Sequence, residues 1–547
     1  MHPERMGVAF PTRLSFMRSL IRRMNRERWR IECKELAFDN DGYGHAIYTA
    51  RGRDRTYSLV AFSHALEEDQ RTDRVIAEAW DASFVLFDGI PDAADIDRLS
   101  EQTPRQEGGR FQASEIILSR ANRSVRLFDH VRDALAAGKQ PDMNRIAEVG
   151  YLMRTTAVYG NGKFGVCDRE RIAGRPEFAG PFQAEMLTVY LIRCFTHDHV
   201  EYVAHRLSAE TFQPMAPAAK RFLGIGNATG LGMAPFLITH PELIHLWTRA
   251  RETALNRVRA VSKADAEVCH RCHDLLHRAR RHVSDWQVQD RAQQQRISAL
   301  SRDLCRLSEW IVGTSRPLHQ PYPWDGVYRW AGAECSLECQ ELVLSLLLEL
   351  YPHEVDPLED ELSTTLNIGI DGSMSVGEVK AVIEENYGWA LEIDFKQAAS
   401  NAYFWYYSED KMEPRLGQRA AEAGADNEMP IAIARDVERL YRCLSEFPTA
   451  TPIATLLLKH PSHRHVVKRV QTIMQYPYGE VQSNLIGVCC RPIDLLRWKL
   501  AYFGASKFDP KSDLWTRITL YQGAPLPFEL HSSDADDWCF PVRPQEI

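Results

Sequence analysis

WRIECKELAFDNDGYGHAIYTARGRDRTYSLVAFS, residues 29–63, is the stretch that decides the fold. Apolar and polar side chains alternate along its three runs, where β-branched and aromatic residues are frequent, as they are in strands. The intervening DNDG and RGRDR contain the glycine, asparagine and aspartate of tight turns. This pattern predicts an antiparallel β-meander over residues 29–90, which FVLFDG (84–89) extends.

The stretch before the meander, TRLSFMRSLIRRMNRERWR (12–30), predicts a basic amphipathic helix, and we assign residues 1–28 to it. Its seven arginines lie mostly off the apolar face. Such a helix binds an anionic membrane surface, a partner or an import receptor, or it packs on the protein body with its arginines in water. We favour packing, because the chain continues into the strands without a linker. The apolar face consists of Leu14, Met17, Leu20, Ile21 and Met24.

Helical patterns dominate after residue 90 and predict a helical domain over residues 91–313 with two glycine-rich loops. In its last three helices, apolar side chains recur every three or four residues, which indicates long antiparallel helices or a bundle. Part of residues 235–312 is therefore a candidate homodimer interface. The predicted helices span 112–136, 142–159, 182–206, 235–261, 263–283 and 285–312.

The proline- and glycine-rich GTSRPLHQPYPWDG (313–326) marks the clearest domain boundary. Beyond it, residues 326–547 predict a mixed, mainly helical C-terminal domain, with a helix in LECQELVLSLLLELY (337–351) and a strand in WTRITLYQG (515–523). The predicted fold class is α+β and predominantly helical. In this architecture an N-terminal antiparallel β-meander is followed by a large helical body with long antiparallel helices.

Composition and charge exclude several classes of protein. The chain has 547 residues, 44% of them hydrophobic, and a formal net charge of -8, whereas a general nucleic-acid binder needs a basic face. Its longest apolar run, LVLSLLLELY, is much shorter than the roughly 20 residues that cross a bilayer, so we expect no membrane span. No secretory signal is recognisable and the twelve cysteines are scattered, which favours reduced thiols and a cytoplasmic protein.

Two glycine-rich stretches are candidate anion-binding loops. In AVYGNGKFGVCDR (157–169), a phenylalanine follows the lysine, so the sequence is not a P-loop, although its turn can bind an anion through backbone N–H groups. GIGNATGLGMAPF (224–236) lacks the preceding strand of a dinucleotide-binding motif, but its glycines permit close approach of a ligand. Both stretches can instead simply turn the chain. The substrate-binding candidates here are Arg154, Asn161, Lys163, Asn227 and Thr229.

An aromatic segment supplies a further substrate-binding candidate. NAYFWYYSEDKMEPRLGQR (401–419) combines five aromatic side chains with Arg415, which suits a carboxylate or phosphate. The alternative is a buried aromatic core with a paired arginine. We expect Arg415 to share one anion pocket with Arg154 and Lys163.

Three residues are candidate catalytic groups. WAGAECSLECQE (330–341) places Glu334 and Cys335 near a predicted helix start, where the macrodipole stabilises a carboxylate or a thiolate. Tyr407 lies in the aromatic segment. Glu334 or Tyr407 would serve as the general acid–base group, and Cys335 would instead serve as a nucleophile.

One stretch carries a haem-attachment motif and half of a candidate zinc site. VCHRCHDLLH (268–277) matches the CxxCH pattern of c-type haem attachment through Cys269, Cys272 and His273, but Cys272 belongs to the apolar stripe of a regular helix. A zinc site that Cys269 and Cys272 share with Cys335 and Cys339 is an alternative. We predict no metal and no cofactor.

A second candidate metal motif lies in CFTHDHVEYVAHR (194–206). It places His197, Glu201 and His205 on one side of a helix. The two histidines are about 12 Å apart along the axis, which is too far for one ion. We therefore expect solvated or ion-paired side chains here.

Taken together, these signals favour an intracellular enzyme that acts on a small anionic organic substrate bearing a carboxylate or phosphate. General acid–base chemistry without a cofactor fits a lyase or an isomerase. Two other classes stay open: a non-catalytic helical scaffold or regulatory protein, and a metal- or c-haem-containing redox protein. The expected partners are the small-molecule substrate and a second copy of the chain, with no nucleic acid.

Overall fold

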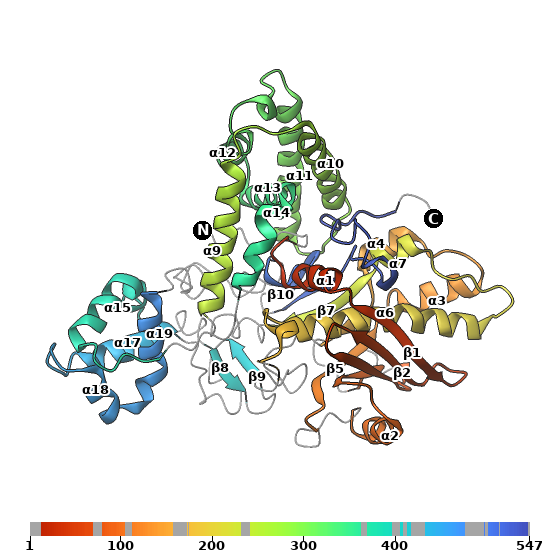
Figure 1. Ribbon diagram of the computed structural model, residues 1–547, viewed down its shortest axis with the longest axis horizontal. Coiled ribbons are helices and arrows are strands. Elements are labelled where there is room, and N and C mark those ends of the chain that lie inside the picture. Colours follow the sequence, from red (N-terminus) through yellow and green to blue (C-terminus); the bar gives the residue numbers. More distant parts are fainter. Residues whose placement is uncertain are drawn as a thin grey trace. The chain divides into compact units, whose positions relative to one another are not determined.

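A computed structural model gives the architecture of the chain (Figure 1). Contacts divide it into two compact units. Unit 1 comprises Met1–Glu4, Leu231–Thr253 and Asp360–Leu496, and unit 2 comprises Arg5–Gly230, Ala254–Glu359 and Arg497–Ile547. The structure describes residues 12–68, 79–103, 112–156, 172, 174–230, 241–362, 369–396, 405–408, 413–416, 433–475, 497, 501–512 and 515–544.

Unit 2 is built on a nine-stranded mixed sheet with the strand order β1-β2-β3-β4-β5-β6-β7-β11-β10. Neighbouring strands are antiparallel except β6 and β7, which are parallel. The strands β1 to β4 form an antiparallel meander, as the sequence predicts, and the meander continues into β5. The strands are β1 (Arg30–Phe38), β2 (Gly44–Arg51), β3 (Thr56–Ser63), β4 (Ala82–Asp88), β5 (Glu115–Arg123), β6 (Tyr151–Thr155), β7 (Gly224–Gly230), β10 (Lys507–Ser512) and β11 (Trp515–Leu520).

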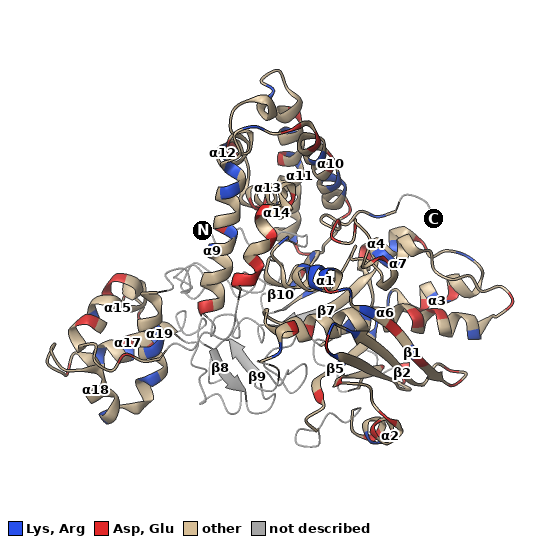
Figure 2. Cartoon of the chain, in the orientation of Figure 1, with Lys and Arg blue, Asp and Glu red and all other residues tan. Residues whose placement is uncertain are grey.

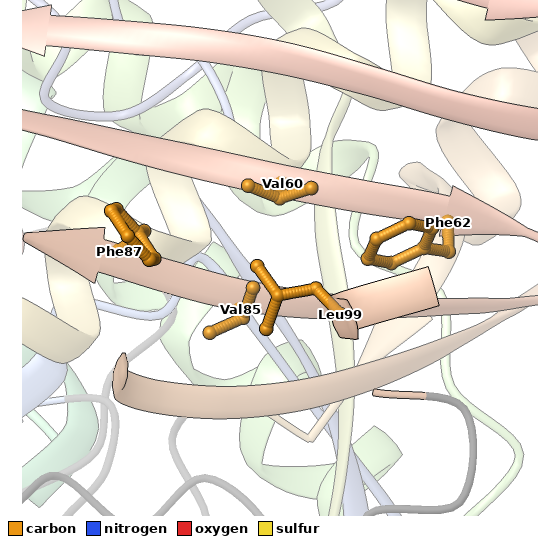
Figure 3. Close-up of a cluster of buried hydrophobic side chains, with 5 residues drawn as sticks. All are labelled: Val60, Phe62, Val85, Phe87 and Leu99. Atoms are coloured by element: carbon orange, nitrogen blue, oxygen red, sulfur yellow. The ribbon is translucent and has the colours of Figure 1, made fainter. Parts of the chain in front are cut away.

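Successive side chains of a strand point to opposite faces of the sheet. Helices cover the apolar side chains on both faces of the meander. On one face, α2 (Ala93–Gln102) inserts Leu99 among Val60, Phe62, Val85 and Phe87, and all five side chains are buried (Figure 3). On the other face lies α6 (Gln183–Leu207), whose Phe195 ring packs edge-on against Phe84 at 5.4 Å. The helix α6 is buried along most of its 25 residues and connects β6 to the parallel strand β7.

The remaining helices of unit 2 include α10 (Ala266–Ser284) and α11 (Arg291–Val312), in the stretches 263–283 and 285–312 where the sequence predicts helices. α10 packs against α11 and α13 (Leu337–Leu350), and α12 (Pro323–Glu334) packs against α13. The predicted domain boundary at residues 313–326 lies between α11 and α12, within unit 2. Other elements are α1 (Phe16–Arg26), α3 (Phe128–Ala136), α4 (Met143–Val149), α7 (Pro217–Phe222), α14 (Pro352–Val355) and the 3₁₀ helices η6 (Asp356–Glu361) and η9 (Pro527–Glu529).

Unit 1 is mainly helical. α15 (Val376–Leu391) packs against α17 (Ile433–Leu444) and α19 (Arg464–Ile473), beside α18 (Ile453–Lys459). The strands β8 (Trp405–Ser408) and β9 (Glu413–Leu416) form an antiparallel pair. α9 (Pro241–Arg259) begins in this unit. Across the described residues of both units, the protein is α+β and mostly helical, and none of the described helices is long and apolar enough to cross a membrane.

Two predicted helices are partly wrong, because apolar periodicity alone does not separate short strands from helices. The first part of 112–136 is β5, and only its end is α3. In 142–159, α4 ends at Gly150, whose φ of 82° closes the helix in the left-handed conformation, and β6 follows. The helix predicted over 182–206 is confirmed as α6.

The candidate ligand loop over residues 224–236 is wrong for residues 224–230, which form the strand β7 inside the sheet, and residues 231–236 lie outside the described residues. The glycines permit close packing there. A Cβ on Gly226 would lie 2.6 Å from the ring of Tyr151 in β6, and one on Gly224 would lie 2.3 Å from the backbone oxygen of Leu520 in β11. Close approach of neighbouring strands therefore explains these two glycines without a ligand.

The N-terminal helix α1 packs on the protein body, and its apolar face is buried as predicted. The expectation that its arginines lie in water is wrong for Arg18, which is fully buried, and for Arg22, whose side chain is 9% exposed. Arg13, which precedes the helix, is also buried. Figure 2 shows the basic residues of α1 and the acidic residues near α14.

Arginines of the α1 region and four carboxylates form one ionic network. Arg18 donates to Glu349 at 3.0 Å and, through Nε, to Asp536 at 3.1 Å. Arg13 also donates to Glu349, at 3.0 Å. The network joins α1 to α13, η6 and the C-terminal segment. Its carboxylates are Glu349, Asp356, Glu359 and Asp536.

Candidate functional site

A cavity of about 470 Å³ in unit 2 lies against the edge strand β1, the helix α6 and the 3₁₀ helix η9, and we call it the β1–α6 cavity. β1 is the first strand of the sheet and pairs only with β2 within the described strands. Trp29 and Cys33 contribute from the β1 side, and Phe528 from η9. The polar lining residues are Arg30, Glu32, Tyr48, Arg193, His197, Asp198, Lys220 and His531.

The helix α6 contributes its lining residues from one side. Arg193, Cys194, His197 and Asp198 follow the spacing i, i+1, i+4 and i+5, which brings side chains onto one helical face. Tyr48 comes from β2 across this face, and its hydroxyl donates to Asp198 at 2.7 Å. The packing of α6 on the sheet therefore fixes the distance between these two polar groups.

Arg193 is a buried cation that is bound by backbone carbonyls. Its guanidinium donates to the carbonyls of Lys220, Arg221, Leu223, Ala524 and Pro525 at 2.8–3.2 Å. Three of these carbonyls belong to the end of α7, where a helix leaves its last carbonyls without internal partners. Burial lowers the pKa of Arg193, and no carboxylate in the described part of the chain forms an ion pair with it. Its positive charge is thus solvated by backbone carbonyls, and Glu529 attracts it without forming an ion pair.

His197 is held as a neutral imidazole. Burial, followed by the positive charges of Arg193 and Lys220, lowers its pKa well below the ordinary value. Its side chain lines the cavity, while its Nε2 atom is buried without a hydrogen-bond partner. The other ring nitrogen bonds the backbone at Leu223, so the free Nε2 atom of the neutral imidazole can only accept a hydrogen bond, and it is a weak base.

Asp198 is the half-buried carboxyl group of the cavity. Burial raises its pKa, and the hydrogen bond from Tyr48 opposes this shift. A carboxylate whose proton affinity is increased in this way is a better base than an exposed aspartate. The two cysteines near it are thiols at neutral pH, since burial raises the pKa of Cys33 and raises that of Cys194 to about 12.

Lys220 gives the cavity an amine that is accessible. Its side chain is 20% exposed and pairs with Glu201 at 2.8 Å. Glu201 also accepts a hydrogen bond from the Met215 N–H at 2.7 Å. Glu201 is therefore an ion-paired helical side chain, as expected, whereas the expectation of a solvated or ion-paired side chain is wrong for His197, which is buried and neutral.

The predicted substrate-binding residues lie outside the β1–α6 cavity where the structure describes them. Arg154 is buried in β6, next to β7, in which Asn227 is fully buried and donates to the Thr155 carbonyl at 2.7 Å. The fold thus places these two residues within the sheet and not in the lining of the cavity. Thr229 pairs with Thr516 in the backbone register of β7 and β11.

Other predicted residues lie wholly or partly outside the described part of the chain. Asn161 and Lys163 are not among the described residues. Tyr407 lies in β8 and Arg415 in β9, where the register pairs them with Pro414 and Tyr406, but their side chains are not described. The anion pocket predicted for Lys163, Arg154 and Arg415 therefore stays a prediction.

The candidates Glu334 and Cys335 lie between two helices. Glu334 is the last residue of α12, and Arg306 donates to its carboxylate at 2.7 Å. Cys335 precedes Ser336, the N-cap residue of α13. A hydrogen bond with Cys339 lowers the pKa of Cys335, in the direction that a nucleophilic role requires.

The CxxCH motif lies in the helix α10. Cys272 is fully buried there, and burial raises its pKa to about 12. Covalent haem attachment needs thiols that the haem can reach, so the packing of Cys272 counts against this motif as a haem site. Cys269 and Cys272 also do not join Cys335 and Cys339 in any ligand group found among the described residues.

The sequence signal for the β1–α6 cavity is the run of polar residues in a helix that is otherwise apolar. Arg193 and His197 are both at most 4% exposed in the middle of α6, where a buried helix normally carries apolar side chains. Comparison of the chain with protein families, with curated proteins and with solved structures finds no match.

Proposed function

We propose that the chain is an enzyme that carries out general acid–base chemistry, of the lyase or isomerase type, on a small anionic organic molecule bound in the β1–α6 cavity. The observation that carries the proposal is Arg193, a buried cation without a carboxylate partner in the described chain, beside a half-buried carboxyl group. A buried guanidinium with no ion pair in the described chain attracts a carboxylate or a phosphate.

The roles of the polar residues follow from their protonation. Lys220 contacts the anionic group, because its ammonium group lines the cavity and is partly exposed. Asp198 acts as the general base, since its raised proton affinity favours proton abstraction. His197 remains neutral, and its Nε2 atom can accept a hydrogen bond from a hydroxyl or acid group of the substrate. These assignments replace Glu334, Cys335 and Tyr407 as the proposed catalytic groups.

Ligand binding provides the first test. Wild-type protein is screened by thermal unfolding against small carboxylates and organophosphates, and a ligand at about 100 times its Kd stabilises the fold by about 2.7 kcal/mol. In the double variant Lys220→Met/Glu201→Gln, which removes the pair without leaving a buried charge, we expect affinity to fall by about 10- to 100-fold, since hydrogen bonds to charged groups contribute about 1.5–3 kcal/mol.

Lys139→Met is the matched control, because Lys139 is an exposed lysine outside the cavity lining. It should bind the ligand as the wild type does. The proposal is wrong if no anionic compound stabilises the wild type, or if the double variant keeps full affinity. A non-catalytic scaffold is then the better alternative, and light scattering tests the homodimer that this alternative predicts through residues 235–312.

A further inference from the structure

A second chemical site lies where α11 meets the start of α13, on residues separate from the β1–α6 cavity. The Sγ atoms of Cys335 and Cys339 and a carboxylate oxygen of Asp303 all lie within 4.8 Å of one another. Asp303 comes from the middle of α11, whereas the two cysteines flank the N-cap of α13. The fold therefore brings two sulfur ligands and one oxygen ligand to one point.

Hydrogen bonds hold this ligand group in place. Asp303 Oδ2 accepts the Ser336 N–H at 2.7 Å, which fixes the carboxylate against the backbone between the two cysteines. The Cys335 carbonyl accepts from Gln340 at 2.9 Å, and the Glu334 carbonyl accepts from Arg306 at 2.8 Å. The backbone on both sides of Cys335 is thus fixed without a metal, and such second-shell contacts orient ligands.

We propose that Asp303, Cys335 and Cys339 form a binding site for one Zn²⁺ ion. Zinc takes cysteine sulfur at about 2.3 Å and carboxylate oxygen at about 2.0–2.2 Å, so two sulfurs of a tetrahedral site lie about 3.8 Å apart. The observed limit of 4.8 Å between ligand atoms is close to this spacing. Two thiolates select a borderline-soft ion over Mg²⁺ or Ca²⁺.

The fourth coordination position of this site lies on the side of Cys335, which is the partly exposed ligand. Asp303 and Cys339 are buried, but Cys335 is partly exposed, so water reaches the ion from the side of Cys335. A site with three protein ligands and one water differs from a closed structural site with four protein ligands. It also differs from the four-cysteine site considered from the sequence, because Asp303 takes the place of Cys269 and Cys272.

Cobalt binding tests the site in the full chain. Reduced protein is stripped with a chelator and titrated with Co²⁺, which gives thiolate-to-cobalt charge-transfer bands and tetrahedral d–d bands when two thiolates bind it. We expect one Co²⁺ per chain and displacement of the bands by Zn²⁺. Metal binding should also raise Tm, since the ion binds the folded state.

Three variants locate the binding site. Cys335→Ser should abolish the charge-transfer bands. Asp303→Asn should weaken Co²⁺ binding by more than about 10-fold, while its amide oxygen still accepts the Ser336 N–H and preserves the fold. Cys269→Ser, at a half-buried cysteine outside the group, should bind as the wild type does.

Three outcomes overturn the proposal. The first is the absence of thiolate-to-cobalt bands in fully reduced wild-type protein. The second is equal band intensity in Cys335→Ser and the wild type, which would place the metal elsewhere. The third is a Cys335–Cys339 disulfide that forms in air and is reversed by a thiol reductant, with no metal bound after reduction.

Discussion

Replacing Arg18 by Met lowers the free energy of unfolding by about 3–5 kcal/mol, which is the expected cost of removing one partner from a buried ion pair. Arg18 is fully buried and bonds Glu349 and Asp536, while Arg13 also bonds Glu349. Its removal leaves carboxylates that are buried and only partly compensated. Chemical denaturation monitored by tryptophan fluorescence measures the change.

Arg26→Met is the matched control for this prediction. Arg26 lies on the same helix, but its side chain is 56% exposed and its nearest carboxylate, Glu359, is 3.8 Å away. Exposed pairs contribute about 0–1 kcal/mol, so this variant should unfold nearly as the wild type does. Equal destabilisation by the two variants would show that helix propensity, rather than the ionic network, sets the effect.

Acid unfolding tests how much the carboxylates of the same network contribute to the free energy of unfolding. Burial raises the pKa of Asp536, but the guanidinium groups of Arg18, Arg22 and Arg13 outweigh it and hold the pKa well below its usual range. A carboxyl group with a depressed folded-state pKa stabilises the protein above its unfolded pKa, about 4, and this contribution is lost as the pH falls further. We expect a smaller acid dependence in Asp536→Asn, measured by denaturation between about pH 2 and 5.

Local patterns predicted the elements but not the partners of their charged residues. The alternation in residues 29–63 is local, so the strands β1 to β3 could be predicted from it. The arginines of α1 looked solvated, because Glu349 and Asp536 are 331 and 518 residues away from Arg18 in the chain. The spacing of apolar residues within one helix gives no information about contacts with residues so far away in the sequence.

The same limit applies to the candidate sites. The spacing of His197 and Asp198 in α6 is visible in the sequence, but the contact of Asp198 with Tyr48 depends on how the helix crosses the sheet, 150 residues away. The CxxxC spacing of Cys335 and Cys339 is also visible, whereas Asp303 joins them only because α11 packs on α13. Glycines 224 and 226 predict a loop from the sequence alone, whereas in the structure the close approach of neighbouring strands accounts for them.

Asp198→Asn should remove nearly all turnover while it leaves ligand binding intact. The asparagine keeps the size of the side chain and an oxygen that accepts the Tyr48 hydroxyl, so the fold and the cavity should persist. It cannot take up a proton, and the loss of a general base typically slows a reaction by about 10²–10⁴-fold. The rate is measured as deuterium incorporation into the ligand identified by thermal unfolding, with Asp129→Asn at an exposed position of α3 as the control.

The pH dependence separates catalysis by Asp198 from a structural role. The base is active only when ionised, and because burial raises its pKa, the rate should fall on acidification at a higher pH than an ordinary aspartate, with a pKa of about 4, would allow. The Tyr48 hydrogen bond lowers this pKa, so Tyr48→Phe should move the acidic limb of the profile to still higher pH. A residue that only supports the fold would change the amount of active protein without moving the limb. An unchanged limb in Tyr48→Phe, together with full exchange in Asp198→Asn, would contradict the assignment of Asp198 as the base.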